Sequence, residues 1–408
     1  MAGLSDYTSR DWHLDVRPGE GKRILSLDGG GVRGLVTLGI LQRIEETLAP
    51  RFPGKCEDFR LSHYFDLIVG TSTGAIIATA LALGMRVNDI KILYEKMCPE
   101  IFSRRADTSW YEYVVPEGTI SSIYDEKKIE NALKDIAKDR QLQSAELQTG
   151  LMLCAKRMDT GSPWILTNNP KAPYWIKGRN NEYELWRLIR ASTAAPLYFE
   201  PVTVVISPKD GVYDGETGVF VDGAVAGLNN PSFQAFLAAT LKPYGFHWPS
   251  GRDNVFMVSV GSGWWRNRQD RQKFMALRNW EKAKEAISGM IQDTSLNAIT
   301  TLQGMSNPKK PWYINSEILD LDGHLCRDEE MLSFQRYDAT IDEAAVKRVF
   351  PEGTVDLGPL RDIGSTDPEV LRRLYALGHA VGRVTRPGTD GIEPADFPDI
   401  FDPPGFGP

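Results

Sequence analysis

The sequence contains little cysteine and histidine and no long apolar segment. Its 408 residues include five histidines and four cysteines. The cysteines form no C-x-x-C pair and have no histidines at metal-ligand spacing, which argues against a zinc site and a disulfide framework. We therefore expect buried free thiols in a reducing compartment. The longest apolar run, Ala75–Met85, is too short to span a bilayer and indicates a core helix.

The sequence also has no long block of positive charge. The formal net charge is -7, and the lysine pairs at 127–128 and 309–310 stand alone. This pattern argues against a nucleic-acid polymer as partner. Met1–Asp15 mixes acidic and basic residues without the apolar core of a signal peptide, so we expect a cytoplasmic protein. An acidic protein can still contact a membrane through apolar side chains.

The segment Gly70–Gly74, with sequence GTSTG, lies between two stretches of opposite character. Phe65–Val69 is a short apolar run typical of a strand, and Ala75–Leu83 has the Ala, Leu and Ile content of a buried helix. A strand that turns into a helix around G-x-S-x-G is a nucleophile elbow, because the glycines allow the tight turn and expose the serine. Ser72 would lie at a helix N-terminus, whose free N–H groups and dipole favour a developing alkoxide. Ser72 is therefore the candidate nucleophile.

A glycine-rich loop follows the first predicted strand, Arg23–Leu27. Its sequence, DGGGVRG over Asp28–Gly34, leads into a predicted helix at Leu35–Leu48. The loop also satisfies the dinucleotide fingerprint G-x-G-x-x-G in the correct strand-to-helix context. However, a dinucleotide-binding fold would not need the second elbow at Ser72, and no clear ribose-binding acid ends the next strand.

The alternative use of these glycines is an oxyanion hole. Without Cβ atoms, Gly29, Gly30 and Gly31 allow backbone N–H groups to face a tetrahedral intermediate closely. Arg33 follows near a helix N-terminus, where the dipole disfavours a cation. We therefore expect Arg33 to hold either a carboxylate, in a structural ion pair, or an anionic ligand.

A second candidate catalytic side chain stands at the end of a short apolar strand, Gly218–Val221. Asp222 comes directly after this strand, and Gly223 makes the turn. An aspartate in this position is where an open α/β sheet places catalytic groups. Asp214 also precedes a glycine, but its polar lead-in indicates an ordinary turn.

The proton acceptor for Ser72 has two possible identities. Histidine is the usual base, and the chain order Ser, Asp, His would select His324 or His379, although neither closely follows an obvious strand. The alternative is a dyad in which Asp222 takes the proton from Ser72. Aspartate is a weak base at its ordinary pKa of about 3.9. The dyad therefore requires a site that raises this pKa, for example by burial.

Three motifs in this order and spacing resemble the patatin-like phospholipases. They are DGGGVRG at Asp28–Gly34, GTSTG at Gly70–Gly74 and DGA at Asp222–Ala224. Ala191–Pro196 and Asn229–Pro231 also match, and the resemblance covers about residues 23 to 263. The family more often has glycine at the position of Ala224.

The resemblance implies an α/β protein with a three-layer α/β/α fold around a mainly parallel central sheet. The expected organisation is an N-terminal arm at 1–22, a catalytic domain at 23–265, a mainly helical extension packed on it at 266–385 and a Pro-rich tail at 386–408. The arm should be irregular, and the tail should be disordered or draped on the surface. The clearest helices of the extension are predicted at Trp280–Met290 and Glu369–His379.

The function that the resemblance implies is that of a lipid acyl hydrolase of phospholipase A type. Ser72 would attack the ester carbonyl, Asp222 would accept the proton, water would cleave the acyl-enzyme, and Gly29, Gly30 and Gly31 would form the oxyanion hole. The expected substrates are membrane phospholipids or galactolipids, with no cofactor and no metal. The protein would visit the membrane as a transient peripheral protein, through aromatic side chains such as Trp110, Trp264 and Trp265.

Three further hypotheses accompany this one. Some bacterial relatives degrade the host membrane in anti-phage defence when a cyclic nucleotide activates them. A small cyclic-nucleotide activator is therefore a hypothesis here, with a site expected after residue 266, although no nucleotide motif is recognisable there. The other two are a Ser-Asp-His esterase for small soluble esters and a non-catalytic binding module, which the intact Ser72 and Asp222 disfavour.

Overall fold

The computed structural model describes residues 6–103, 122–176, 180–196, 198–206, 217–266, 270–352, 355–381 and 391–407. Within these ranges, eight strands form a mixed sheet in the order β5-β6-β3-β2-β1-β7-β8, with β4 also paired to β3. The strands are β1 (Lys22–Leu27), β2 (Leu67–Thr71), β3 (Gly150–Arg157), β4 (Pro163–Thr167), β5 (Val202–Val205), β6 (Thr217–Asp222), β7 (Val255–Val260) and β8 (Ser333–Tyr337). Strands β3, β2, β1, β7 and β8 are parallel, whereas β4, β5 and β6 pair antiparallel.

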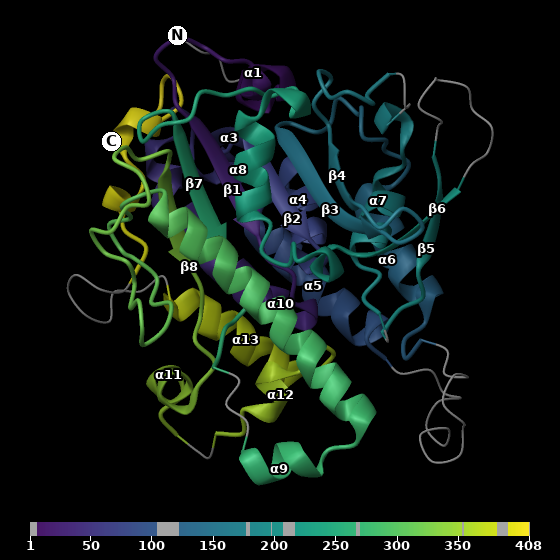
Figure 1. Ribbon diagram of the computed structural model, residues 1–408. Coiled ribbons are helices and arrows are strands. Elements are labelled where there is room, and N and C mark those ends of the chain that lie inside the picture. The colour runs from purple at the N-terminus through teal and green to yellow at the C-terminus, as the bar shows by residue number, and fades with distance from the viewer. Residues whose placement is uncertain are drawn as a thin grey trace.

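The α-helices connect these strands and cover the sheet (Figure 1). They are α1 (Arg10–Leu14), α2 (Gly34–Leu48), α3 (Leu61–Tyr64), α4 (Thr73–Ala82), α5 (Val87–Ile101), α6 (Glu126–Ala137), α7 (Leu185–Ser192), α8 (Ser232–Thr240), α9 (Arg271–Ala276), α10 (Asn279–Gly304), α11 (Glu343–Val349), α12 (Gly358–Arg361) and α13 (Pro368–Val381). Among the described residues, no helix has both the length and the apolar character that crossing a membrane requires.

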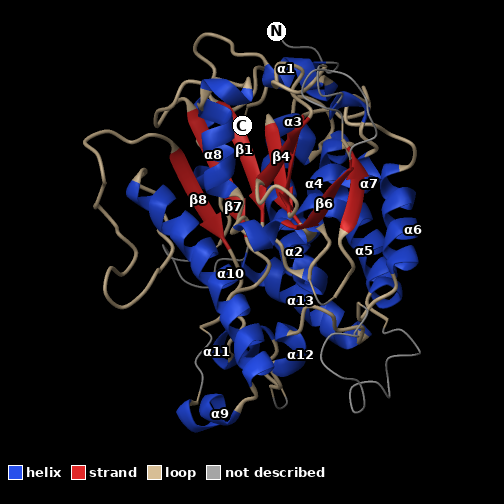
Figure 2. Cartoon of the chain, turned by 45° about the vertical axis from the view of Figure 1, so that its right-hand side comes forward, coloured by secondary structure: helices blue, strands red, loops and turns tan. Residues whose placement is uncertain are grey.

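Different helices cover the two faces of the sheet (Figure 2). Leu25 of β1 and Ile68 of β2 belong to a core with residues of α2, α4, α5 and α13. Their chain neighbours Ile24 and Leu67 belong to a second core with residues of α8 and α10. Successive side chains of a strand point to opposite faces, so these two cores lie on opposite sides of the sheet. The predicted three-layer α/β/α fold with a mainly parallel sheet is confirmed.

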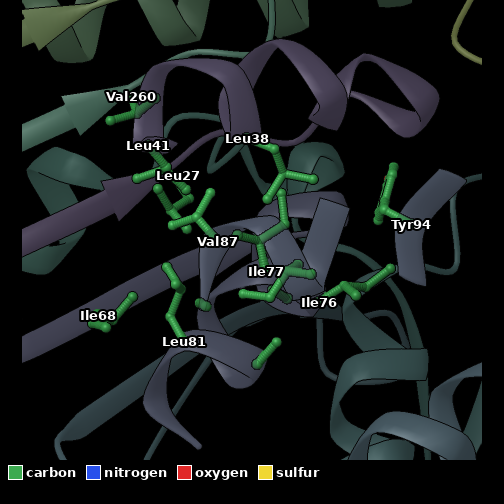
Figure 3. Close-up of a cluster of buried hydrophobic side chains, with 14 of the residues drawn as sticks. Leu27, Leu38, Leu41, Ile68, Ile76, Ile77, Leu81, Val87, Tyr94 and Val260 are labelled. Atoms are coloured by element: carbon green, nitrogen blue, oxygen red, sulfur yellow. The ribbon is translucent and has the colours of Figure 1, made fainter. Parts of the chain in front are cut away.

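Helix α4 follows the candidate nucleophile and is buried along its whole length. Figure 3 shows its side chains Ile76, Ile77 and Leu81 packed among Leu38 of α2 and Tyr94 of α5. A helix that is apolar on all sides is stable only inside a core, which is where the sequence predicted this one. The close packing on α4 fixes its N-terminus and therefore the position of Ser72.

The region after residue 266 adds a strand to the sheet, which the sequence did not predict. Strand β8 pairs in parallel with β7, from Phe256 opposite Ser333 to Val260 opposite Tyr337. Its sequence, SFQRY, has no apolar run that would indicate a buried strand. Arg336 is nevertheless buried, because it forms ion pairs inside the protein. The division of the chain at residue 265 remains a prediction, and the sheet continues across that boundary. Helix α10 also continues well beyond its predicted end at Met290.

The two ends of the chain are more ordered than the sequence suggested. In the N-terminal arm, His13 of α1 is buried and its Nδ1 lies 2.9 Å from Asp66 Oδ1. Arg23 also pairs with Asp66, and its Nη1 donates to the Phe401 carbonyl at 3.0 Å. Phe397 and Phe401 are buried in the core, so the prediction of a disordered or surface-draped tail is wrong for residues 391–407. Besides these two aromatic side chains, hydrogen bonds from Arg51 to the Phe397 carbonyl and to Asp402 hold the segment.

The cysteine prediction is half correct. All four cysteines are free; Cys98 and Cys154 are buried as expected, whereas Cys56 and Cys326 are exposed. The predicted aromatic segment around Trp110 lies outside the described residues.

Candidate active site

Ser72 lies at a sharp turn between β2 and α4. Its backbone has φ 55 and ψ -124, a region that residues with a side chain rarely adopt. No side chain fits at the two flanking glycines. A Cβ on Gly70 would lie 2.1 Å from Gly74 O, and one on Gly74 would lie 2.3 Å from Leu27 O. The predicted strand-turn-helix context is confirmed, and the strained backbone exposes the serine at the end of the sheet.

The elbow is held by hydrogen bonds that sequence reasoning did not identify. Ser72 N–H donates to Ser192 Oγ at 2.9 Å, and Ser192 Oγ donates to the Cys154 carbonyl at 2.6 Å. On the other side, Thr71 Oγ1 donates to the Leu228 carbonyl at 2.6 Å. Ser192 stands at the end of α7 and is fully buried. Its only sequence signal was its place in the matching stretch Ala191–Pro196.

Asp222 lies beside Ser72, at the end of β6. Strand β6 runs antiparallel to β3, so this carboxylate reaches the site from an antiparallel strand at the edge of the mainly parallel sheet. The Ser72 side chain lies close enough to the Asp222 carboxyl to lower its pKa. Gly223 is required directly after it, because a Cβ there would lie 2.5 Å from the Cys154 carbonyl oxygen. The structure thus brings the two candidate catalytic residues together.

The environment of Asp222 makes it a stronger base than an ordinary aspartate. The residue is 3% exposed. Burial raises the pKa of its carboxyl from 3.8 to about 6, against the opposing effect of the nearby Ser72 side chain and of the hydrogen bond from Ala224 N–H. The Ala224 bond is 2.8 Å long. A base with this pKa is mostly ionised at neutral pH yet still able to accept a proton.

The glycine loop between β1 and α2 lies against the nucleophile. A Cβ on Gly29 would lie 3.2 Å from Ser72 Cβ and 2.7 Å from Asn229 Oδ1. Gly29 N–H donates to the Asn229 carbonyl at 3.0 Å and is therefore not free for a substrate. In the described part of the chain, the N–H groups of Gly30 and Gly31 have no hydrogen-bond partner. These two amides are the better candidates for an oxyanion hole.

Two side chains fix the end of this loop. The carbonyl of Gly31, whose φ is 60, accepts from Thr73 Oγ1 at 2.8 Å and from the Tyr94 hydroxyl at 2.7 Å. Thr73 begins α4 directly after Ser72, so the loop and the nucleophile belong to one hydrogen-bonded unit.

Arg33 has no carboxylate partner within ion-pair distance in the described residues. Its guanidinium lies over the Trp265 ring at 4.7 Å and makes only long contacts, 3.4 Å to Gly30 O and 3.5 Å to Gly263 O. Burial lowers its pKa to about 10, so it is still charged at neutral pH. Of the two predicted roles, the structural ion pair is not formed, and a role toward an anionic ligand remains a prediction.

The histidines lie elsewhere. His379 is on α13, where its Nε2 is 3.9 Å from Glu46 of α2. His324 is exposed in the loop before β8, and its N–H donates to the Leu321 carbonyl. No histidine contributes to the pKa shift of Asp222 or lines the pocket at Ser72.

An apolar pocket opens beside Ser72, between α4, α5 and α6. Its walls include Ile76, Met97, Ile101, Ile129 and Phe199. The enclosed volume is about 50 Å³, which is room for only a few water molecules at roughly 10–15 Å³ each. The chemistry of the walls suits a hydrocarbon chain, and a fatty-acyl chain needs these walls to move apart.

Comparison with known families agrees with this geometry. The family model described as patatin-like phospholipase matches residues 25–236, which is just over half of the chain. The chain belongs to the patatin-like phospholipase family. Within this family match lie the glycine loop, the elbow and Asp222, whereas β8 and the helices α9 to α13 lie outside it.

Individual relatives of this patatin-like protein match in part. It is 30% identical over 240 residues to a cGAMP-activated phospholipase from Escherichia coli (strain TW11681), covering 59% of this chain and 62% of that relative. It is 32% identical over 211 residues to human calcium-independent phospholipase A2-gamma, covering 49% of this chain and 25% of that relative. The chain thus spans less than two thirds of the length of these relatives.

The crystal structure of VipD from Legionella pneumophila aligns with 88% of this chain and 66% of that chain, at 12% identity and a TM-score of 0.33. At this TM-score the likeness adds nothing to what the sheet order and the two cores already establish.

Proposed function

We propose that the protein is a lipid acyl hydrolase that uses Ser72 and Asp222 as a catalytic dyad. The observation that carries this proposal is a buried carboxylate with a raised pKa, which lies beside a serine on a strained elbow at the wall of an apolar pocket. Membership of the patatin-like phospholipases supports an ester of a glycerolipid as substrate.

The reaction follows from the positions of these groups. Ser72 Oγ attacks the ester carbonyl carbon while its proton passes to Asp222. The resulting oxyanion accepts hydrogen bonds from the Gly30 and Gly31 N–H groups, and each such donor typically lowers the barrier by about 2.7–4 kcal/mol. The intermediate collapses, the alcohol leaves with the proton from Asp222, and the acyl group stays on Ser72. Water then attacks the acyl-enzyme with Asp222 again as base, and the fatty acid is released.

The substrate class is tested with vesicles of two compositions, phosphatidylcholine and monogalactosyl diacylglycerol. Release of fatty acid from either supports a membrane-lipid hydrolase and selects the headgroup. Turnover of short soluble esters without release from any vesicle would support the alternative, a small-ester esterase. Because the acyl pocket is nearly closed, the assay includes cyclic GMP–AMP, the activator named for the Escherichia coli relative. We include cyclic-nucleotide activation in the proposal on the strength of that relative.

The pH dependence of the reaction is expected to follow Asp222. Because the base form is needed, kcat/KM on a soluble ester should rise about tenfold per pH unit below pH 6 and level off above the pKa of about 6. Histidine has an ordinary pKa of about 6.5, so the midpoint alone does not distinguish the two bases. The control is therefore the same profile in His324→Ala and His379→Ala, which should be unchanged. A rate that stays constant from pH 5 to pH 8 would contradict the role of Asp222.

The membrane-contact surface predicted from aromatic residues needs correction. Trp265 is half-buried beneath Arg33 and Arg361, and Trp264 packs edge-on against Trp312. Exposed apolar side chains instead gather on α9 and the first half of α10, namely Met275, Ile287 and Met290. We propose that these helices make the transient contact with the membrane.

Three observations support this placement. Helix α10 lies against the segment that follows Asp222. A Cβ on Gly227 would lie 3.4 Å from Thr294, and Asn229 Nδ2 donates to Ser295 Oγ at 3.4 Å. Arg271 and Lys273 on α9 are exposed cations that suit anionic headgroups. Helix α9 also projects from the body of the protein at the end opposite the C-terminus (Figures 1 and 2).

Replacement of Ile287 by serine is expected to weaken binding to phospholipid vesicles about tenfold, because a partly inserted apolar side chain contributes about 1–2 kcal/mol. Cosedimentation with vesicles measures the effect. The matched control is Ile400→Ser, since Ile287 is 55% exposed and Ile400 is 54% exposed near the other end of the molecule. Equal losses in both variants would contradict this membrane surface. Turnover of a soluble ester should be unchanged in both.

A further inference from the structure

A second cleft lies in the part of the protein that the family match does not cover. It is bounded by the C-terminal end of β8, by α11 and α13, and by the loops that follow β7 and α10. Figure 1 shows these elements together, with α11 and α13 below β8. The cleft has a volume of about 760 Å³, within the range of about 300–1,000 Å³ that small-molecule sites have.

The charged lining of this cleft favours an anion. Four cationic residues line it, Lys309, Lys310, Arg336 and Arg348, against two acidic ones, Asp320 and Asp338. Lys310 pairs with Asp396, and Arg336 pairs with Asp28 and Asp338, so Lys309 and Arg348 are the lining cations without a carboxylate partner among the described residues. This is the reverse of the overall charge of the chain, which is -7. Arg348 on α11 is exposed and has no hydrogen-bond or ion-pair partner within the described ranges.

Three aromatic side chains line the same cleft. The rings of Trp264 and Trp312 are 6.2 Å apart in an edge-to-face arrangement, and Tyr313 next to them is 43% exposed. Aromatic faces of this kind stack on planar rings, and a neighbouring cation strengthens the contact with an electron-rich base.

Two buried donors at the cleft lack acceptors. Neither the Trp312 Nε1–H nor the Arg336 Nε–H has a hydrogen-bond partner in the described structure. Arg336 is 6% exposed, so this donor lies in a site where an unpaired polar group is costly. Both donors belong to residues that line the cleft.

Arg336 connects the cleft to the glycine loop. Its Nη2 lies 2.7 Å from Asp28 Oδ2 and 2.8 Å from Asp338 Oδ2, and its Nη1 lies 3.1 Å from Asp28 Oδ1. Asp28 is the first residue of the loop that carries Gly30 and Gly31.

A second connection runs through Asp338, whose Oδ1 accepts from Gly263 N–H at 2.8 Å. The preceding residue, Ser262, donates to the Gly29 carbonyl at 2.7 Å. Two chains of hydrogen bonds thus join the wall of the cleft to the glycine loop.

We propose that this cleft binds a small phosphorylated aromatic molecule of the nucleotide class, and that its occupancy shifts the glycine loop through Arg336 and Asp338. The phosphate would contact the cationic residues, and the base would stack on the Trp312 and Tyr313 side. The binding half of the proposal stands independently of catalysis. The coupling half rests on the proposed function, because its readout is the reactivity of Ser72.

Calorimetric titration of the full chain tests binding. The probes are cyclic GMP–AMP and AMP, with inorganic pyrophosphate as a phosphate-only comparison. We expect at least one nucleotide to bind more tightly than pyrophosphate, and Arg348→Gln to weaken that binding about tenfold. The matched control is Lys347→Gln, which removes one positive charge from the same helix at a residue that does not line the cleft and pairs with Glu343.

Three results of this titration would count against the proposal. One is the absence of binding by both nucleotides up to about 1 mM, which corresponds to about -4 kcal/mol. Another is an equal loss of affinity in the two α11 variants, which would indicate general charge attraction and not this cleft. Pyrophosphate binding as tight as that of the nucleotides would likewise reject the aromatic component.

The coupling is tested by the rate at which a fluorophosphonate labels Ser72. The saturating nucleotide should change this rate at least threefold in the wild type, and the same concentration should have a smaller effect in Arg348→Gln. A rate that does not respond while binding is intact would overturn the coupling. If Ser72 is not labelled in any condition, the proposed function fails, and the titration still decides whether the cleft binds a nucleotide.

Discussion

Replacement of Asp222 by asparagine is expected to lower kcat for ester hydrolysis by about 10⁴-fold or more, as loss of a member of a catalytic serine unit does. The amide keeps the shape of the side chain and can still accept the bond from Ala224 N–H, but it cannot take the proton from Ser72. The measurement is kcat on a soluble ester beside Asp159→Asn, which alters an exposed acid on the β3–β4 turn. A loss of less than about tenfold would show that another group is the base.

The same substitution should stabilise the fold. The pKa of Asp222 rises from 3.8 to about 6 on folding, so folding disfavours the ionised carboxylate. The cost is absent below pH 3.8, grows as pH rises toward the folded pKa, and is complete above it at roughly 3 kcal/mol. The amide of the variant does not titrate, so the variant avoids this cost.

Chemical denaturation of the wild type and Asp222→Asn at pH 8 and pH 5 measures this effect. The variant should have the higher free energy of unfolding at pH 8, and the difference should shrink at pH 5. A variant that is both inactive and less stable at pH 8 would mean that Asp222 is mainly structural. Loss of activity with gain of stability is the expected signature of a residue kept for catalysis.

Replacement of Ser72 by alanine is expected to remove turnover almost completely, with a loss of about 10⁶-fold in kcat, because the nucleophile that carries the acyl group is lost. Labelling by a fluorophosphonate should disappear with it. Ser250→Ala, at an exposed serine in the loop before β7, is the matched control and should be labelled like the wild type. Persistent labelling of the Ser72→Ala variant would locate the nucleophile elsewhere.

The sequence predicted the elements that carry strong local patterns. The elbow at Ser72 and the buried helix after it were predictable, because glycines at fixed spacing and an apolar helix have few structural alternatives. The position of Asp222 at a strand end was predictable too, but the antiparallel direction of its strand was not, since strand direction depends on pairing with a distant segment.

Other parts of the site could not be predicted, because they depend on contacts between residues far apart in the chain. From the sequence alone, Arg336 would be predicted to be exposed. It is buried because it pairs with Asp28, which stands more than 300 positions earlier in the chain. Ser192 supports the elbow only through its place in three dimensions. The Gly29 N–H is bonded to the Asn229 carbonyl, so only the amides of Gly30 and Gly31 remain for an oxyanion hole. The three glycines look alike in the sequence, which therefore could not show this difference.

The burial of the C-terminal tail also depends on contacts with distant residues. The acidic, Pro-rich composition of the tail indicated disorder, yet Phe397 and Phe401 find places in the core beside strand β7. Composition averages over a segment, whereas a few aromatic side chains at the right positions decide whether it packs.

Release of fatty acid from phospholipid vesicles by three proteins in parallel tests the central claim most directly. They are the wild type, Asp222→Asn and the double variant His324→Ala/His379→Ala, each with and without cyclic GMP–AMP. The account predicts equal release by the wild type and the double histidine variant under the same condition, and none by Asp222→Asn. Loss of release in the histidine variant, or release by Asp222→Asn at the wild-type rate, would contradict a dyad of Ser72 and Asp222.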